Sequence, residues 1–445
     1  MAWLLAALAA VNGCSLSFLH PGGKPASKAA PPPAAPVHTA TLTIVPETAV
    51  ASVVKLPKGF AALPNKPPLW LAGGGAIALV GKRGERTVVL ILSGPGLSRV
   101  REAVTEAGRA STPDRILDVA ASPNGSMLAL ARQSSSAGAP AVELHVLGPQ
   151  GDDALVGVIA MPAVWAGLSW VDPATLAVLI KAAIPSPGAP AAVSGPGGLY
   201  LAHLGGGQAS LHAWTVRCPL SPLSWSPSGR LAIGQGDGVA PPVLLDVGRN
   251  VCEPFNTTQP IRVVSWAPDS SGFAFLGPGP TDRSMGIFRY DIARDAAELL
   301  AVSSAAAAYI RSGDLLVVGN HALSWGAVQA NPSLPVVAEI ALFNRAQPQK
   351  KVLSLGVNTT PVLLAASTMT YSPLLDLAAL ELYAASPAGP MRVLLAHDPA
   401  GKTTTIGYGE ARGVVLTAWA PGDGRLAILE SDGQASDLAV VLPRR

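Results

Sequence analysis

The chain has 445 residues, of which 49% are hydrophobic and 13% are charged, about half the charged fraction of a typical soluble domain. Its 31 Lys and Arg residues against 28 Asp and Glu residues give a net charge of +3 without a basic cluster, which argues against a nucleic-acid-binding protein. The 46 Gly and 42 Pro residues alternate with runs of Val, Leu and Ile, so they predict turns between many short strands rather than collagen or disorder.

Residues 1–13 predict a signal peptide. The apolar run that ends at Val11 is shorter than the roughly 20 residues of a transmembrane helix but has the length of a secretory signal core. The sequence Val11-Asn12-Gly13-Cys14 resembles a lipobox, which implies that Cys14 is lipidated and begins the mature protein. No Lys or Arg precedes the apolar run, and Asn12 is unusual at its position. The alternatives are an ordinary secretion signal and a buried apolar N-terminus.

Residues 14–38 are expected to form the lipidated Cys14 and a linker. The stretch from Pro21 to Pro36 consists mainly of Pro, Ala, Gly and Lys and has no hydrophobic periodicity, so it cannot bury a core. We expect a tether that lifts the body of the protein, residues 39–445, from a membrane surface. The alternative is a disordered tail without a role.

One pattern recurs along the rest of the chain. A short apolar strand ends near Trp or Ser, a turn of Pro, Asp, Ser or Gly follows, and a second apolar strand is rich in Leu and Ala. The strongest copies are Leu223–Ile233 (LSWSPSGRLAI), Val264–Phe275 (VSWAPDSSGFAF), Thr417–Ile428 (TAWAPGDGRLAI) and Val119–Leu130 (VAASPNGSMLAL). With the weaker copies, the turns fall near residues 74, 123, 173, 227, 268, 313, 373 and 421.

These turns recur about every 50 residues, a period typical of propeller blades, and helical 3.6-residue periodicity is absent. A second hairpin between successive turns, as in Gly286–Leu300 and Val243–Glu253, completes four strands per repeat. These Trp-x-Pro-Asp/Ser-x-Gly-x-Leu-Ala units resemble the blades of TolB-like and related WD-repeat bacterial propellers. The resemblance covers residues 40–445 and implies an all-β chain with a single β-propeller. The turn and its Trp are expected to be structural and not a site.

The ends of the chain bear on the number of blades. Only one clear strand, Asp437–Leu442, follows the last repeat, so the final blade lacks a strand. We expect Ala40–Val45 to supply it by pairing the N-terminus with the C-terminus, which hides both sheet edges. Eight turns then favour eight blades of four strands, with seven as the alternative because three copies are weak.

The sequence contains three cysteines. With Cys14 lipidated, Cys218 and Cys252 are left, and in an exported protein they can form a disulfide. Two buried free thiols are the alternative.

No catalytic, cofactor or metal site is predicted. The seven His residues include no zinc-binding spacing, although His203 and His212 could face each other across a hairpin, and the Gly-x-Ser-x-Gly motif of hydrolases is missing. Glycines at 195–198 and 205–207 do not lie between a strand and a helix, so they do not predict a phosphate site.

Low charge and long loops favour a binding surface. The segments Ala182–Gly198 and Ser324–Pro335 exceed a tight turn and are expected to project from one face of the propeller. The leading hypothesis is a non-catalytic, exported lipoprotein of the cell envelope, a scaffold or accessory subunit that binds envelope or membrane proteins and needs no cofactor or metal. The alternatives are a small-ligand or glycan-binding propeller and, less favoured, a hydrolase or lyase with a site in the central channel.

Overall fold

The computed structural model describes residues 37–444 apart from short gaps. The gaps are 39–41, 47–48, 106–107, 110–111, 114, 135–139, 149–152, 162, 183–197, 205–208, 215–222, 236–240, 256–260, 279–284, 303, 321–337, 344–349, 356–363, 387–388, 399 and 411–412. Within the described part, no helix is both long and apolar enough to cross a membrane.

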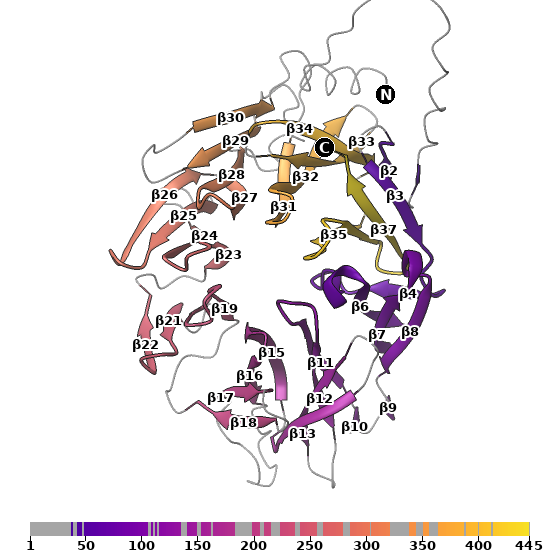
Figure 1. The fold of residues 1–445 in the computed structure, drawn as a ribbon, viewed down its shortest axis with the longest axis vertical. Helices are drawn as coiled ribbons and strands as arrows, with labels where there is room; N and C mark the ends of the chain where they lie inside the picture. Colours follow the sequence, from indigo (N-terminus) through magenta and orange to yellow (C-terminus); the bar gives the residue numbers. More distant parts are fainter. Residues whose placement is uncertain are drawn as a thin grey trace, which may run out of the picture.

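The chain folds into a ring of eight antiparallel sheets around a central opening, an eight-bladed β-propeller (Figure 1). The eight blades settle the count that the sequence left between eight and seven. In blades 2 to 7 the chain runs outward from the centre, strand by strand, and then returns to begin the next blade.

The strands of blades 2 to 8 can be grouped by their distance from the centre. The innermost are β11 (Arg115–Ala121), β15 (Ala163–Asp172), β19 (Leu223–Trp225), β23 (Arg262–Trp266), β27 (Ser304–Tyr309), β31 (Leu364–Ser372) and β35 (Val414–Trp419). The second are β12 (Leu128–Ser134), β16 (Thr175–Ala182), β20 (Leu231–Gly234), β24 (Gly272–Pro278), β28 (Leu315–Asn320), β32 (Leu377–Ser386) and β36 (Leu426–Ser431). The third are β13 (Ala141–Leu147), β17 (Gly198–His203), β21 (Val243–Asp246), β25 (Met285–Asp291), β29 (Ala338–Phe343), β33 (Gly389–His397) and β37 (Ser436–Pro443). The outermost are β14 (Asp153–Ile159), β18 (Ser210–Ala213), β22 (Val251–Pro254), β26 (Ala296–Val302), β30 (Lys350–Leu355), β34 (Thr403–Glu410) and, in blade 8, β3 (Ala49–Val54).

Blade 1 differs from the others because two short strands share its inner position. Both of these strands pair with β6 (Ala76–Arg83), and the blade also contains two short 3-10 turns. Its elements are β4 (Phe60–Ala62), β5 (Leu69–Leu71), η1 (Ala72–Gly74), β6 (Ala76–Arg83), β7 (Arg86–Ser93), η2 (Pro95–Leu97) and β8 (Arg99–Thr105). A small hairpin of β9 (Gly108–Arg109) and β10 (Thr112–Pro113) leads to blade 2.

The ring closes through a strand from the N-terminal side, but this strand is not the one expected. Val54 pairs with Leu438 and Ala49 with Pro443, so β3 completes blade 8. The expected closing segment, Ala40–Val45, instead contains β2 (Leu42–Ile44), which pairs with β34 of blade 7 and is followed outward by β1 (Val37–His38). Both segments are short and apolar, and their distance along the chain from the first blade decides which one meets β37.

Each pair of neighbouring blades encloses its own hydrophobic core. Successive residues of a strand point to opposite faces of a sheet, so alternate residues serve different neighbours. In β36, Leu426 and Ile428 pack toward blade 7, while Ala427 and Leu429 pack toward blade 1. Eight such clusters among the described residues match the eight interfaces between blades.

The repeat turns lie between the first two strands of each blade, and we call the side of the ring that carries them the inner-turn face. The turns at 122–127, 226–230 and 420–425 contain Gly125, Gly229 and Gly424 at positive φ. Asn or Asp side chains accept a backbone N–H two residues on, as Asn124 does from Ser126 at 3.0 Å. The predicted turns therefore occur at all eight positions and are structural devices.

Tryptophans at the ends of several innermost strands join their blade to the preceding one. The indole Nε1 of Trp70, Trp170 and Trp419 donates to the backbone carbonyl of Ala418, Ala120 and Thr370, respectively, at 2.8–3.1 Å. Trp266 donates instead to the hydroxyl of Ser224 at 3.0 Å. These four tryptophans therefore have the structural role expected from the sequence, and Trp419 also lines a pocket.

Candidate functional site

Two of the three cysteines lie outside the described residues. They are Cys14, the expected lipidation site, and Cys218. Cys252 lies on β22 and is disulfide-bonded. The pairing of Cys218 with Cys252 and the lipidation of Cys14 stay predictions.

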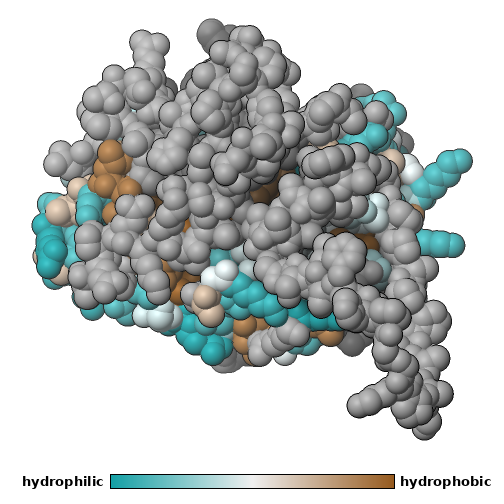
Figure 2. All heavy atoms as spheres, turned by 90° about the horizontal axis from the view of Figure 1, so that it is seen from above, coloured by the Kyte–Doolittle hydropathy of each residue, from teal (hydrophilic) through white to brown (hydrophobic). Residues whose placement is uncertain are grey.

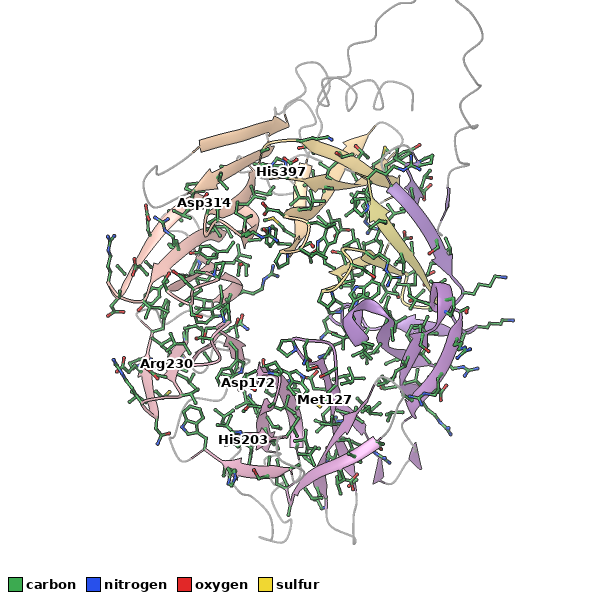
Figure 3. All side chains as sticks on the ribbon, viewed as in Figure 1. Met127, Asp172, His203, Arg230, Asp314 and His397 are labelled. Atoms are coloured by element: carbon green, nitrogen blue, oxygen red, sulfur yellow. The ribbon has the colours of Figure 1, made fainter. Side chains whose placement is uncertain are left out.

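The expected neighbourhood of His203 and His212 is present on blade 3. Their strands form the hairpin β17–β18, and the two rings lie 6.0 Å apart between centroids. His203 lies toward the outer rim, away from the central opening (Figure 3). Within the described ranges, no group of three or more His, Cys, Asp or Glu residues is placed to hold a metal.

Asp118 of β11 is an acidic side chain on an innermost strand. The sequence analysis did not identify its structural role. Its carboxylate accepts the backbone N–H of Leu168 in blade 3 at 2.7 Å and forms an ion pair with Lys66 of blade 1. It also accepts the N–H of Val119 at 2.8 Å. Asp118 therefore joins three blades.

The candidate site is a pocket of about 400 Å³ on the inner-turn face, between blades 6, 7 and 8. We call it the inner-turn pocket. Its walls include Arg311, Tyr371, Pro373, Leu374, Trp419 and Pro421, which come from the inner turns of the three blades and the strand ends beside them. More of its exposed wall is apolar than polar, and Leu374 is 45% exposed beside it.

The polar groups of this pocket are held by the protein itself. The hydroxyl of Tyr371 accepts the backbone N–H of Arg311 at 2.8 Å and donates to the carboxylate of Asp376. Burial, together with the hydrogen bond to Asp376, raises the pKa of Tyr371 to about 12, so the phenol stays neutral. The guanidinium of Arg311 donates to the carbonyl of Pro373.

With these polar groups engaged, the aromatic ring faces and aliphatic groups of the pocket are left to contact a bound molecule. Trp419 also uses its indole N–H internally, on Thr370 at 3.1 Å. Pockets with apolar walls and a few fixed polar groups bind apolar or aromatic groups of a partner.

A second pocket, of about 550 Å³, lies next to the first between blades 7 and 8. Asp376, which binds Tyr371, also lines this outer pocket, together with Asp398, Lys402, Arg444 and several apolar residues. The Oδ1 of Asp398 accepts the backbone N–H of Lys402 at 2.8 Å and thereby shapes the turn on its rim. The outer pocket is therefore more charged than the inner-turn pocket.

The sequence analysis did not identify either pocket, because their walls combine residues from separate repeats. One signal was present. Tyr309 and Tyr371 replace the repeat Trp in blades 6 and 7, and Leu374 and Leu375 stand where other copies have Asp, Ser or Gly.

The expected loops Ala182–Gly198 and Ser324–Pro335 lie almost wholly outside the described residues. Both connect the second and third strands of their blades, so their flanking strand ends share the face opposite the inner turns.

No protein-family model matches the chain, and no curated protein matches it. Several solved structures, however, are similar to this chain. The Dos1 propeller is 12% identical, with a TM-score of 0.51, over 87% of this chain and 95% of that one. At this identity, the similarity shows the propeller fold alone.

Two further similar structures have TM-scores below 0.5 and carry no weight for function. TolB from Acinetobacter baumannii is 14% identical, with a TM-score of 0.33, over 72% of this chain and 80% of that one. A prolyl endopeptidase is 15% identical, with a TM-score of 0.46, over 87% of this chain but only 55% of the peptidase, so this chain spans about half its length. TolB proteins and other propellers are thus among the structures similar to this chain, as the turn motifs led us to expect.

Proposed function

We propose that this chain is a non-catalytic propeller that binds a partner protein at its inner-turn face, and that lipidated Cys14 and the linker hold it at a membrane of the cell envelope. The observation that carries the proposal is the inner-turn pocket. Leu374, Pro373 and Pro421 offer apolar groups beside the aromatic Trp419, on a frame fixed by internal hydrogen bonds. Aromatic residues, Trp and Tyr above all, are among those that dominate the energetics of protein interfaces.

The chemistry of the described inner strands supports binding over catalysis. Asp118 is engaged with two neighbouring blades, and Asp172 accepts the backbone N–H of Ala174 at 2.7 Å in its turn. A channel hydrolase needs free acids or bases that converge from several blades. The proposal therefore assigns the chain no reaction.

A small-ligand binder is the second candidate function, and the outer pocket favours it. Carboxylates and cationic side chains line one cavity of about 550 Å³, within the size range of small-molecule sites. Under this alternative, substitutions in the outer pocket would change function while those in the inner-turn pocket would not.

The test compares two matched surface substitutions in the full-length protein. Leu374→Glu places a charge beside the inner-turn pocket, and Val414→Glu places the same charge at an exposed apolar residue that does not line it. Each protein is purified from its native membranes in mild detergent, and stoichiometric partners are identified by mass spectrometry. We expect the wild type and Val414→Glu to retain an envelope protein that Leu374→Glu loses.

Retention of that protein by Leu374→Glu, or a wild type without a stoichiometric partner, would contradict the proposed binding. The intact mass of the same material tests the anchor separately. We expect the mature chain to begin at Cys14 with a diacylglycerol adduct. An unmodified N-terminus would refute the anchor and leave the binding result unaffected.

A further inference from the structure

The two most exposed large apolar side chains of the described part lie close together on one strand. Leu155 is 57% exposed and Val158 is 49% exposed, and both belong to β14, the outermost strand of blade 2. They lie opposite His145 and Glu143 of β13, whose side chains contact each other at 3.3 Å. A bulge in the β13–β14 pairing places Leu155 and Val158 on the same face of the sheet, where they form one apolar patch.

The strand β14 also presents an open edge. It is the last strand of its sheet, and no strand of the described ranges pairs with its outer side. After Asp153 the strand reads Ala-Leu-Val-Gly-Val-Ile without a charge. Proteins usually blunt such edges with charges, proline, short strands or covering segments, because an open edge recruits further strands.

Several other outermost strands of this propeller are blunted in these ways. In blade 7, β2 covers the edge of β34, with Leu42 opposite Gly409 and Ile44 opposite Gly407. The other means are charges in β8, a terminal proline in β22 and a length of only four residues in β18 and β22. In the coloured part of the rim that Figure 2 shows, hydrophobic residues lie beside hydrophilic ones.

The strand is held firmly from its other face. Gly157 packs so closely on blade 3 that a Cβ atom there would lie 3.2 Å from a side-chain carbon of Leu211, and Ile159 is buried. Asp153 contacts His145 through its carboxylate at 2.8 Å, which fixes the beginning of the strand. A fixed strand with a free edge and an apolar face is preorganised to accept another strand.

We propose that β14 binds an extended segment of a partner protein as an additional antiparallel strand. Backbone hydrogen bonds along the edge would supply affinity, and alternating apolar side chains of the segment would cover Leu155 and Val158. Because the strands run in opposite directions, a Lys or Arg at the C-terminal end of the segment would lie beside Asp153. The pairing of β2 with β34 is the same mode of strand addition within the chain.

A second copy of this chain is a poorer occupant than an extended segment. Two propellers that meet along one edge of seven residues would bury less than the roughly 1,200 Å² typical of a stable interface. Strand addition by a peptide needs only the edge and its adjacent patch. This surface is separate from the inner-turn pocket, so the inference stands or falls independently of the proposed function.

The experiment uses the full-length protein and a defined probe, the peptide acetyl-Thr-Val-Thr-Val-Thr-Val-Lys-amide. Binding is followed by fluorescence anisotropy of a labelled peptide, and its location by amide hydrogen exchange of the protein. We expect saturable binding with slowed exchange confined to β13 and β14. The double substitution Leu155→Lys and Val158→Lys should weaken binding at least about tenfold, since it charges the patch.

Matched controls separate this effect from unfolding or nonspecific adhesion. Val100→Lys alters another exposed valine on an outermost strand, β8, and should leave binding unchanged, as should Val158→Thr, which keeps a β-branched side chain. Peptides N-methylated at alternate residues should bind in one register and fail in the other, because only one set of N–H groups faces β14.

Three outcomes would overturn the proposal. They are no saturable binding, equal binding of both N-methylated peptides, and slowed exchange outside blade 2. A concentration-dependent dimer in sedimentation, abolished by the double lysine substitution, would also overturn it by assigning the edge to a second copy.

Discussion

A buried ion pair in blade 7 gives the sharpest stability prediction. Arg392 is fully buried and Glu381 is 2% exposed, and the Nε of Arg392 lies 2.7 Å from the Oε1 of Glu381. Arg392 also donates from Nη2 to the carbonyl of Gly413, at the start of blade 8, at 3.0 Å. The pair therefore joins two strands of blade 7 and reaches the next blade.

Arg392→Met keeps much of the side-chain volume but leaves the carboxylate of Glu381 buried without its cation. Removing one partner of a buried pair costs about 3–5 kcal/mol, whereas replacing both partners with apolar residues is often neutral. We therefore expect Arg392→Met to lower the free energy of unfolding by about 3–5 kcal/mol and the added Glu381→Leu substitution to restore most of it.

Urea unfolding at neutral pH, followed by tryptophan fluorescence, measures these differences. The control is Arg289→Met, which breaks the exposed pair with Glu298 and should cost no more than about 1 kcal/mol. The reasoning is refuted if Arg392→Met is as mild as this control, or if the double variant is less stable than the single one.

Three further predictions rest on other parts of the ring. Gly229→Ala should lower stability by about 1–3 kcal/mol in urea unfolding, because φ is +67° and a Cβ would lie 2.5 Å from a carbonyl oxygen of blade 3; Gly313→Ala, at φ +84° with open space around it, should cost less. Asp118→Ala should cost about 1–3 kcal/mol in the same assay by leaving the N–H of Leu168 without its acceptor, and an unchanged midpoint would contradict the role of Asp118 in joining blades. Burial lowers the pKa of His397 below its ordinary value of 6.5, so the unfolded chain binds the proton more readily; thermal stability should fall as pH drops below about 6.5, and His397→Phe should reduce that slope.

The repeat made the architecture predictable from the sequence. Six of the eight turns, all but those near residues 74 and 313, combine a Pro with Asn, Asp, Ser or Gly, and these residues adopt turn conformations for local reasons. Asn124 and Gly125 illustrate this, since one accepts a neighbouring N–H and the other takes positive φ. The tryptophans were predictable as structural residues because an apolar strand end beside a turn must pack on the next sheet.

The closing strand and the pockets were not predictable in the same way. Ala40–Val45 and Ala49–Val54 are both short, apolar and rich in β-branched residues, so composition does not distinguish the strand that meets β37 from the one that meets β34. The inner-turn pocket joins Arg311, Tyr371 and Trp419 across three blades, and only the closed ring brings them together. The structural role of Asp118 also depends on contacts between blades.

The measurement that tests the central claim most directly is the stoichiometry of the full-length protein purified from its native membranes in mild detergent. If the chain is a non-catalytic propeller that binds a partner protein, an envelope protein will accompany it at a fixed molar ratio that Leu374→Glu abolishes. A monodisperse wild-type protein without a partner would contradict the claim and direct attention to small ligands in the outer pocket.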